Sequence, residues 1–166
     1  SRSCKVLWEH SLASAVSSFL GGALHLDTLV ADDSCVYVAS RGRVRCFDVV
    51  SGIARWEEEP EGLNKGIFGA YDLAFMSAVG DVLLVTAANM LVCLKKVNGV
   101  QVWAMPLDFM VKRDCFVLCL LYGNRVAVAS LGWIACYDLQ SGQLAWKNKL
   151  EVRLLILFHF CVVHLV

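Results

Sequence analysis

Cysteines, histidines and aspartates are the residues of this chain that could carry chemistry. Cys115 and Cys119 lie four residues apart, and that spacing would place both thiols on one face of a strand. They lack the C-x-x-C pairing and the nearby histidine that are typical of a zinc site. We therefore expect no metal at these thiols.

The acidic residues and histidines form no recognisable catalytic group. Asp32 and Asp33 are the one acidic pair that resembles a site, but they directly precede the strand-like run 35–40, so a turn role is expected. Four other aspartates also fall at expected strand ends: Asp72, Asp81, Asp108 and Asp114. The four histidines show no catalytic spacing: His10, His25, His159 and His164. No nucleophile elbow, phosphate loop or zinc-helix motif appears. We assign no catalytic residue.

The elements that must position these residues follow from an internal repeat. The pattern Cys-x-Asp-x-x-Ser-Gly-x-x-x-Trp spans residues 46–56 and 136–146. A degenerate copy spans 93–103, with Lys95 in place of Asp and Asn98 in place of Ser. The tryptophans at 8, 56, 103 and 146 are spaced by 48, 47 and 43 residues. A period of 40-odd residues indicates a repeat architecture.

Each repeat reads as four short antiparallel strands separated by turns. The expected strands are 35–40, 44–48 and 53–56; then 72–76, 81–86, 90–94 and 100–103; then 115–120, 125–130, 133–137 and 143–146. Residues 6–9, around Trp8, are expected to be the last strand of a preceding repeat. Turn residues close the hairpins at Gly80-Asp81, Asn98-Gly99, Gly123-Asn124 and Ser141-Gly142. We expect an all-β protein, a β-propeller fragment with four-stranded antiparallel blades at about 9–56, 57–103 and 104–146.

Composition agrees with blades that are covered on both faces. The chain is 58% hydrophobic with a mean hydropathy of +0.60. Residues 82–94 are apolar nearly throughout, as a sheet buried on both sides allows. The alternative is a two-sheet sandwich of about a dozen short strands. The regular return of the Gly-x-x-x-Trp corner argues against it.

These corners resemble the pyrroloquinoline-quinone-type (PQQ-type) repeat, whose tryptophan-docking motif reads Ala-x-Asp-x-x-Thr-Gly-x-x-x-Trp. The resemblance covers residues 1–150, and it implies a propeller similar to quinoprotein alcohol dehydrogenases. It also implies that each tryptophan docks on the turn of the next blade. The structural docking motif would then comprise Trp8, Trp56, Trp103, Trp146, Gly52, Gly99, Gly142, Asp48 and Asp138. Lys95 departs from the family pattern.

Two functions from different classes are compatible with this resemblance. The first is a non-catalytic propeller module that acts as a protein-interaction scaffold and needs no cofactor. The second is a fragment of a quinone-dependent oxidoreductase, which would use PQQ and Ca²⁺. Some members of that class carry a pair of adjacent cysteines, and this chain has none.

Charge and cysteine usage restrict the partners and the compartment. Lys plus Arg and Asp plus Glu both number 15, so no basic surface for nucleic acid is expected, and residues 1–150 are not expected to enter a membrane. The acidic run 57–62 is expected to be a solvated loop. Cys46, Cys93 and Cys136 share one repeat position, and equivalent strands of neighbouring blades are about 10 Å apart, too far for a disulfide. We expect free core thiols, which favours a reducing compartment such as the cytoplasm.

The two ends of the chain suggest a piece of a longer protein. Family propellers have more blades than the three expected here, and the sequence begins with Ser1. Residues 151–166 end in an apolar run of 13 residues, shorter than the about 20 that span a bilayer. Three interpretations stay open for this tail: strands of a further blade, the start of a membrane segment, or non-native sequence such as intron read-through.

Overall fold

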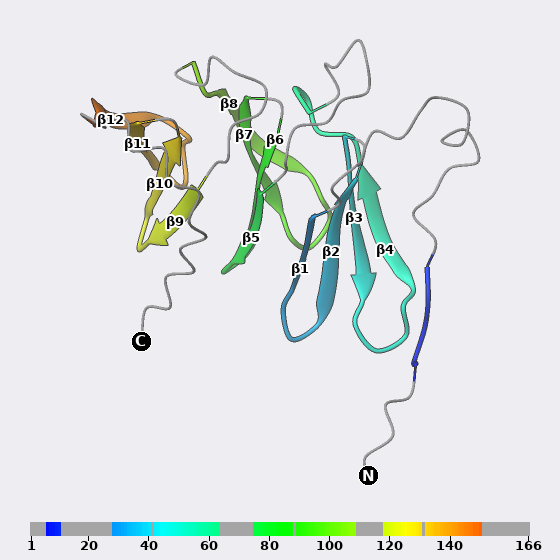
Figure 1. Cartoon of the computed structure of the whole chain (residues 1–166). Helices are drawn as coiled ribbons and strands as arrows, with labels where there is room; N and C mark the ends of the chain where they lie inside the picture. Colours follow the sequence, from blue (N-terminus) through cyan, green and yellow to red (C-terminus); the bar gives the residue numbers. More distant parts are fainter. Residues whose placement is uncertain are drawn as a thin grey trace, which may run out of the picture.

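The computed structural model describes residues 6–10, 28–40, 42–63, 75–87, 89–108, 118–130 and 132–150. These residues form strands and turns and contain no helix. The strands are β1 (Thr28–Ala31), β2 (Cys35–Ser40), β3 (Arg43–Asp48), β4 (Ala54–Glu58), β5 (Phe75–Val79), β6 (Val82–Ala87), β7 (Met90–Lys95), β8 (Gln101–Pro106), β9 (Leu118–Tyr122), β10 (Arg125–Ser130), β11 (Trp133–Asp138) and β12 (Leu144–Lys149). They make three four-stranded antiparallel sheets, which stand side by side (Figure 1). We call them blades 1, 2 and 3.

The three blades share one topology and one irregularity. Strands follow each other in chain order across every sheet, from β1 to β4, β5 to β8 and β9 to β12. The register between the third and fourth strands shifts at Cys46/Phe47, Cys93/Leu94 and Cys136/Tyr137. A bulge re-aims the strand that carries it. The corner motif therefore starts at the same bulge in each blade.

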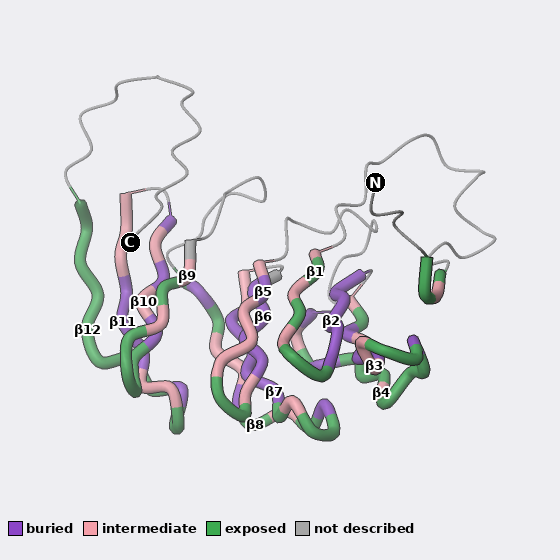
Figure 2. The backbone as a smooth tube through the Cα atoms, turned by 90° about the horizontal axis from the view of Figure 1, so that it is seen from below, coloured by how far each residue is buried: buried purple, intermediate pink, exposed green. Residues whose placement is uncertain are grey.

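Two hydrophobic clusters fill the spaces between the blades. Blade 1 packs against blade 2 through a cluster that includes Tyr37, Val44 and Leu83. Blade 2 packs against blade 3 through a second cluster that includes Leu84 and Val128. The middle blade is therefore covered on both faces, which confirms the expectation from its apolar strands. Figure 2 shows burial concentrated in the inner strands, whereas β12 is exposed along its length.

The first strands of the blades differ from their expected positions. β1 was absent from the expected strands, β5 ends three residues later than expected, and β9 ends two residues later. Residues 72–74 and 115–117 lie outside the described residues. β5 and β9 run up to Gly80 and Gly123, whose φ angles are 51° and 55°. A turn that depends on a glycine in this conformation fixes where the strand before it ends.

Two further expectations were wrong. Residues 6–10 belong to no described strand. The fourth strand of each blade pairs with the third strand of the same blade, and no described strand is available to pair with residues 6–10. The acidic run is not a loop throughout, since Glu57 and Glu58 form part of β4. Glu57 lies opposite Arg45 in the β3–β4 register and accepts a 3.0 Å hydrogen bond from its Nε. Cross-strand pairs of opposite charge favour this pairing.

The cysteines are free thiols wherever they are described: Cys35, Cys46, Cys93, Cys119 and Cys136. The three cysteines at the repeated corner position are buried, as expected. Burial raises the pKa of the Cys46 thiol to about 12 and that of Cys93 to about 11. Cys4, Cys115 and Cys161 lie outside the described residues, as does the tail 151–166. Within the described part of the chain, no helix has the length and apolar character needed to cross a membrane.

Candidate functional site: tryptophan docks and the turn-face groove

The corner turn of blade 1 is organised around the Asp48 carboxylate. Its Oδ1 accepts hydrogen bonds from the backbone N–H groups of Val50 and Ser51, at 3.1 and 2.8 Å, and from the Ser51 hydroxyl at 2.9 Å. Its Oδ2 accepts a 2.6 Å bond from Arg55. Hydrogen bonds from Ser51 and Arg55 hold the pKa of Asp48 well below its usual range, because they favour the charged form.

The corner turn of blade 3 repeats this arrangement. Asp138 Oδ1 accepts from the N–H groups of Gln140 and Ser141, at 3.1 and 3.0 Å, and from the Ser141 hydroxyl at 3.0 Å. Asn124 Nδ2 donates to Asp138 Oδ2 at 2.8 Å. The Asp and Ser of the sequence motif thus satisfy the backbone donors of the turn.

The corner turn of blade 2 keeps the backbone geometry without the carboxylate. Gly99 N–H donates to the Lys95 carbonyl at 2.8 Å, as Gly52 does to Asp48 at 2.9 Å. Asn98 Oδ1 accepts from Val100 N–H at 3.2 Å and is the one turn-capping side chain described there. The loss of the aspartate frees this turn for a different polar contact.

That contact links blade 2 to blade 1. Lys96 Nζ donates to the Gly80 carbonyl at 2.9 Å and pairs with Asp32 Oδ2 at 2.5 Å. Tyr37 Oη donates to the same carboxylate at 3.2 Å. Burial would raise the pKa of Asp32, but the hydrogen bonds from Lys96 and from the backbone N–H groups of Ser34 and Cys35 together outweigh it, and the pKa is lowered. Sequence analysis did not predict this link. The one indication in the sequence was that Lys95-Lys96 departs from the repeat pattern.

Three tryptophans reach from one corner to the next. Trp8 Nε1 donates to the Val49 carbonyl at 3.0 Å, Trp56 to Lys96 at 2.8 Å, and Trp103 to Leu139 at 2.9 Å. The three acceptors share one repeat position, directly after the Asp or Lys of the motif. A buried indole needs such an acceptor for its N–H.

The motif glycines lie beneath these indole rings. A Cβ built on Gly52 would lie 2.5 Å from Trp8 Cγ, and one on Gly142 would lie 2.6 Å from Trp103 Cδ2. One on Gly99 would lie 2.6 Å from Trp56 Cε3. These glycines also have φ near +70°. Both the backbone conformation and the close ring contact therefore require glycine.

The fourth tryptophan of the series differs from the other three. Trp146 is 45% exposed, whereas Trp103 is 9% exposed. The three motif glycines lie beneath other rings, those of Trp8, Trp56 and Trp103. The structure thus brings Trp8, Trp56 and Trp103 onto the motif glycines and leaves Trp146 on the outer strand β12.

The stability of the chain is expected to depend on pH through Asp48. Because its pKa in the fold lies below the unfolded value of about 3.9, the ionised carboxylate stabilises the fold above that pH, and this stabilisation is lost as the pH falls through the folded pKa. Asp48→Asn should therefore flatten the loss of stability between pH 6 and pH 3, measured by urea unfolding at each pH. The matched control is Asp33→Asn, at an exposed aspartate. Equal slopes for wild type and Asp48→Asn would contradict this role.

A groove runs along the ends of the blades where these turns lie. It has a volume of about 940 Å³. Its lining comes from turns of all three blades, among them Ser34, Gly80, Asp81, Val97, Asn124 and Gln140. We call it the turn-face groove. The Lys96–Asp32 pair lies within it, and Val97 is 82% exposed beside it. The described residues contain no group of three or more His, Cys, Asp or Glu that could hold a metal ion.

Comparisons with known proteins agree on the architecture. The family model described as outer membrane protein assembly factor BamB matches residues 1–103. BamB from Moraxella catarrhalis is a similar solved structure, with a TM-score of 0.58 and 21% identity over 74% of this chain and 37% of that one. A search of curated proteins finds no match to the chain.

Other propellers are similar in fold. The quinohemoprotein alcohol dehydrogenase ADHIIG from Pseudomonas putida HK5 has a TM-score of 0.58 and 16% identity over 74% of this chain and 20% of its own. The Neurospora crassa Pan2 WD40 domain has a TM-score of 0.56 and 13% identity over 75% of this chain and 38% of its own. The chain therefore spans between 20% and 38% of the length of these structures, and the shared feature is the β-propeller fold.

Proposed function

This chain belongs to the PQQ-type β-propeller repeat family, whose matching model is described as outer membrane protein assembly factor BamB, and we propose that it is a non-catalytic module that acts as a protein-interaction scaffold. The observation that carries this proposal is the turn-face groove, because turns from three blades form one continuous surface there. The names of two similar proteins, an assembly factor and a WD40 domain, support the same class of function.

The chemistry of the groove suits a protein surface. Val97 and Val102 expose apolar side chains in its lining, and Lys95 and Asp81 place charges of opposite sign near them. Neither Lys95 nor Asp81 has an ion-pair partner among the described residues. Apolar contacts with a polar rim are the usual anatomy of protein interfaces. The partner is therefore a protein segment with an apolar residue flanked by charges of both signs.

We infer that the tryptophan docks hold the groove together. The Trp56 and Trp103 docks each fix a corner turn of one blade to the last strand of the blade before it. The Lys96–Asp32 pair adds a second link between the turns of blades 1 and 2. Because Trp56 bonds to the carbonyl of Lys96 itself, the dock also positions the residue that makes this pair.

The proposal predicts a protein adduct at the groove. A photo-crosslinking amino acid placed at Val97 in the full-length protein should yield a discrete protein adduct in cells, identified by mass spectrometry. The same amino acid at Asn148, on the exposed strand β12, serves as the matched control. Adding Lys95→Glu and Asp81→Lys should lower the yield at position 97, because each substitution reverses the charge at its own position in the groove. No adduct, or equal adducts at both positions, would contradict a scaffold that binds through this groove.

A fragment of a quinone-dependent oxidoreductase is the second candidate, favoured by the structural similarity to the quinohemoprotein alcohol dehydrogenase. Ca²⁺ takes about 6–8 oxygen ligands, and the described residues provide no acidic cluster of that kind. We therefore assign no step of such a reaction to these residues. The full-length protein should leave the absorption spectrum of added PQQ unchanged in the presence of Ca²⁺. A saturable, Ca²⁺-dependent spectral change would favour the oxidoreductase instead.

A further inference from the structure

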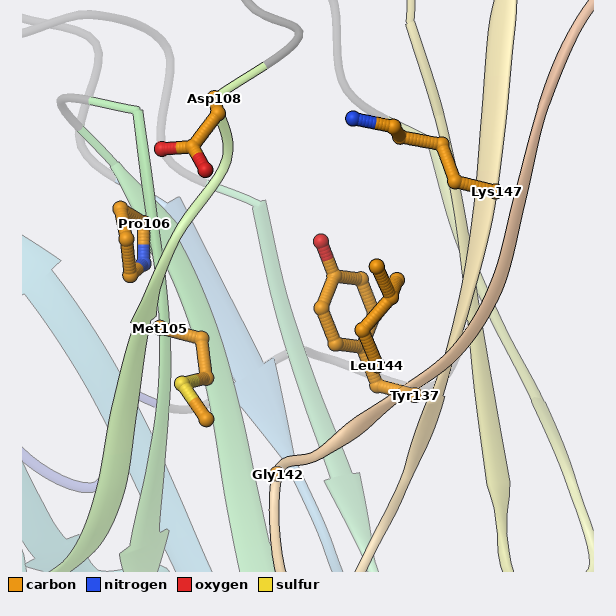
Figure 3. A pocket seen from close by; sticks show the side chains of 7 residues that line it. All are labelled: Met105, Pro106, Asp108, Tyr137, Gly142, Leu144 and Lys147. Atoms are coloured by element: carbon orange, nitrogen blue, oxygen red, sulfur yellow. The ribbon is translucent and has the colours of Figure 1, made fainter.

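A small pocket lies between blades 2 and 3, apart from the turn-face groove (Figure 3). Its volume is about 180 Å³. Met105, Pro106 and Leu144 line it with apolar groups, and Tyr137 contributes its ring. Asp108 and Lys147 add one carboxylate and one ammonium group. The pocket is below the about 300 Å³ at which drug-sized sites begin, so its ligand is small.

Tyr137 is the residue that marks this pocket as a site. The side chain is 5% exposed, and its hydroxyl points toward the space between Asp108 and Lys147 (Figure 3). Within the described part of the chain, this hydroxyl has no hydrogen-bond partner. Burial, together with the negative charge of Asp108, raises the pKa of the phenol, so it remains a neutral O–H donor. Every buried side-chain nitrogen or oxygen of the described residues has a hydrogen-bond partner, so this unpartnered hydroxyl is open to the pocket it lines and can donate to a ligand there.

The repeat does not require a hydroxyl at this position. Phe47 and Leu94 occupy it in blades 1 and 2. A second position, two residues before the motif tryptophan, also differs: it is Gln101 in blade 2 and Leu144 in blade 3. At the interface of blades 1 and 2, the Gln101 side chain accepts a 2.9 Å hydrogen bond from Glu61 N–H. At the interface of blades 2 and 3, the apolar Leu144 cannot make such a bond, and Tyr137 supplies a donor to the pocket instead.

The polar groups of the pocket carry opposite charges on opposite sides. Asp108 comes from the end of blade 2 and Lys147 from β12. The Tyr137 hydroxyl points toward the space between these two side chains (Figure 3). Asp108 and Lys147 form no ion pair with each other. The Lys147 ammonium lies 5.4 Å from the centre of the Trp133 ring. Such a cation–π contact leaves the N–H groups of the ammonium free for a ligand acceptor.

We propose that this pocket binds a free α-amino acid with an aliphatic side chain, such as leucine. The ammonium of the ligand would pair with Asp108. Its carboxylate would accept hydrogen bonds from Lys147 and the Tyr137 hydroxyl, and its side chain would lie against Met105 and Leu144. Each group of the pocket then has a complement in one small molecule. This binding activity does not depend on the scaffold function.

Calorimetric titration of the folded chain with three ligands tests the proposal. L-Leucine carries both charges, 4-methylpentanoate lacks the ammonium, and 3-methylbutylamine lacks the carboxylate. Leucine should bind saturably, and each analogue should bind at least about tenfold more weakly, because one charged hydrogen bond is lost. Absence of saturable leucine binding, or equal binding of all three ligands, would overturn the proposal.

Three variants assign the contacts. Tyr137→Phe should weaken leucine binding about tenfold, whereas Tyr122→Phe, at an exposed tyrosine of β9, should not change it. Asp108→Asn should abolish the preference for leucine over 4-methylpentanoate, and Lys147→Met should abolish the preference over 3-methylbutylamine. A merely structural role would weaken all ligands alike. Circular dichroism and thermal melting of each variant confirm that it is folded, and unchanged affinities in folded variants would contradict the proposed contacts.

Discussion

Replacing Trp103 by alanine is expected to lower the free energy of unfolding by about 3–5 kcal/mol, the usual cost of deleting a buried aromatic side chain. The Trp103 ring packs in the cluster between blades 2 and 3 and lies on Gly142. Its indole N–H also bonds to the Leu139 carbonyl at 2.9 Å. The substitution removes the packing, leaves a cavity and abolishes a hydrogen bond. Because domains are stable by only about 5–15 kcal/mol, urea unfolding measures this loss readily.

Trp146→Ala is the matched control for this substitution. Trp146 occupies the same repeat position on β12 but is 45% exposed. Its removal should cost less than half as much in the same measurement, since less apolar surface leaves contact with the protein. Equal losses for the two variants would show that the contact with Gly142 adds nothing to the contribution of Trp103.

Gly142→Ala is expected to destabilise the chain by about 2–5 kcal/mol. A Cβ at this position would lie 2.6 Å from Trp103 Cδ2, so the indole ring would have to move from its acceptor, and such overpacking costs about 1–3 kcal/mol. The φ of +70° adds strain of about 1–2 kcal/mol for any residue with a Cβ. Thermal or urea unfolding measures the sum of the two effects.

Gly123→Ala separates these two effects. Gly123 also has a positive φ, +55°, but nothing lies within 4 Å of the position that a Cβ would take. Its replacement should cost the backbone strain alone, about 1–2 kcal/mol. If Gly142→Ala costs no more than Gly123→Ala, the close contact between the glycine and the indole ring is not important for stability.

The repeat itself predicted most of the fold. The Gly-x-x-x-Trp corner recurs because each copy makes the same bulge and the same turn, so local chemistry and blade topology agree. The buried strands of blade 2 were also predictable, because both of its faces are apolar in sequence. Turn glycines were recognisable, but the strand before a turn was placed too early where apolar residues continued past its expected end.

The contacts between blades could not be predicted in the same way. The Lys96–Asp32 pair joins residues 64 positions apart, and the sequence around one of them does not identify the other as its partner. Residues 6–9 have a strand-like composition, yet a strand exists only when a partner provides its backbone hydrogen bonds. The unpaired hydroxyl of Tyr137 depends on which residues of blade 2 lie opposite it. Such features arise from packing and were visible only in three dimensions.

Both the groove and the pocket depend on the contact between Trp103 and Gly142, because this contact fixes blade 3 against blade 2. A double-mutant cycle of Trp103→Ala and Gly142→Ala, followed by urea unfolding, tests that contact most directly. With the ring absent, the added methyl group of Gly142→Ala should cost only its backbone strain, and the coupling energy should be about 1–3 kcal/mol. Costs that add to within about 0.5 kcal/mol would show that the two residues act independently, and would contradict the docking of one blade on the next.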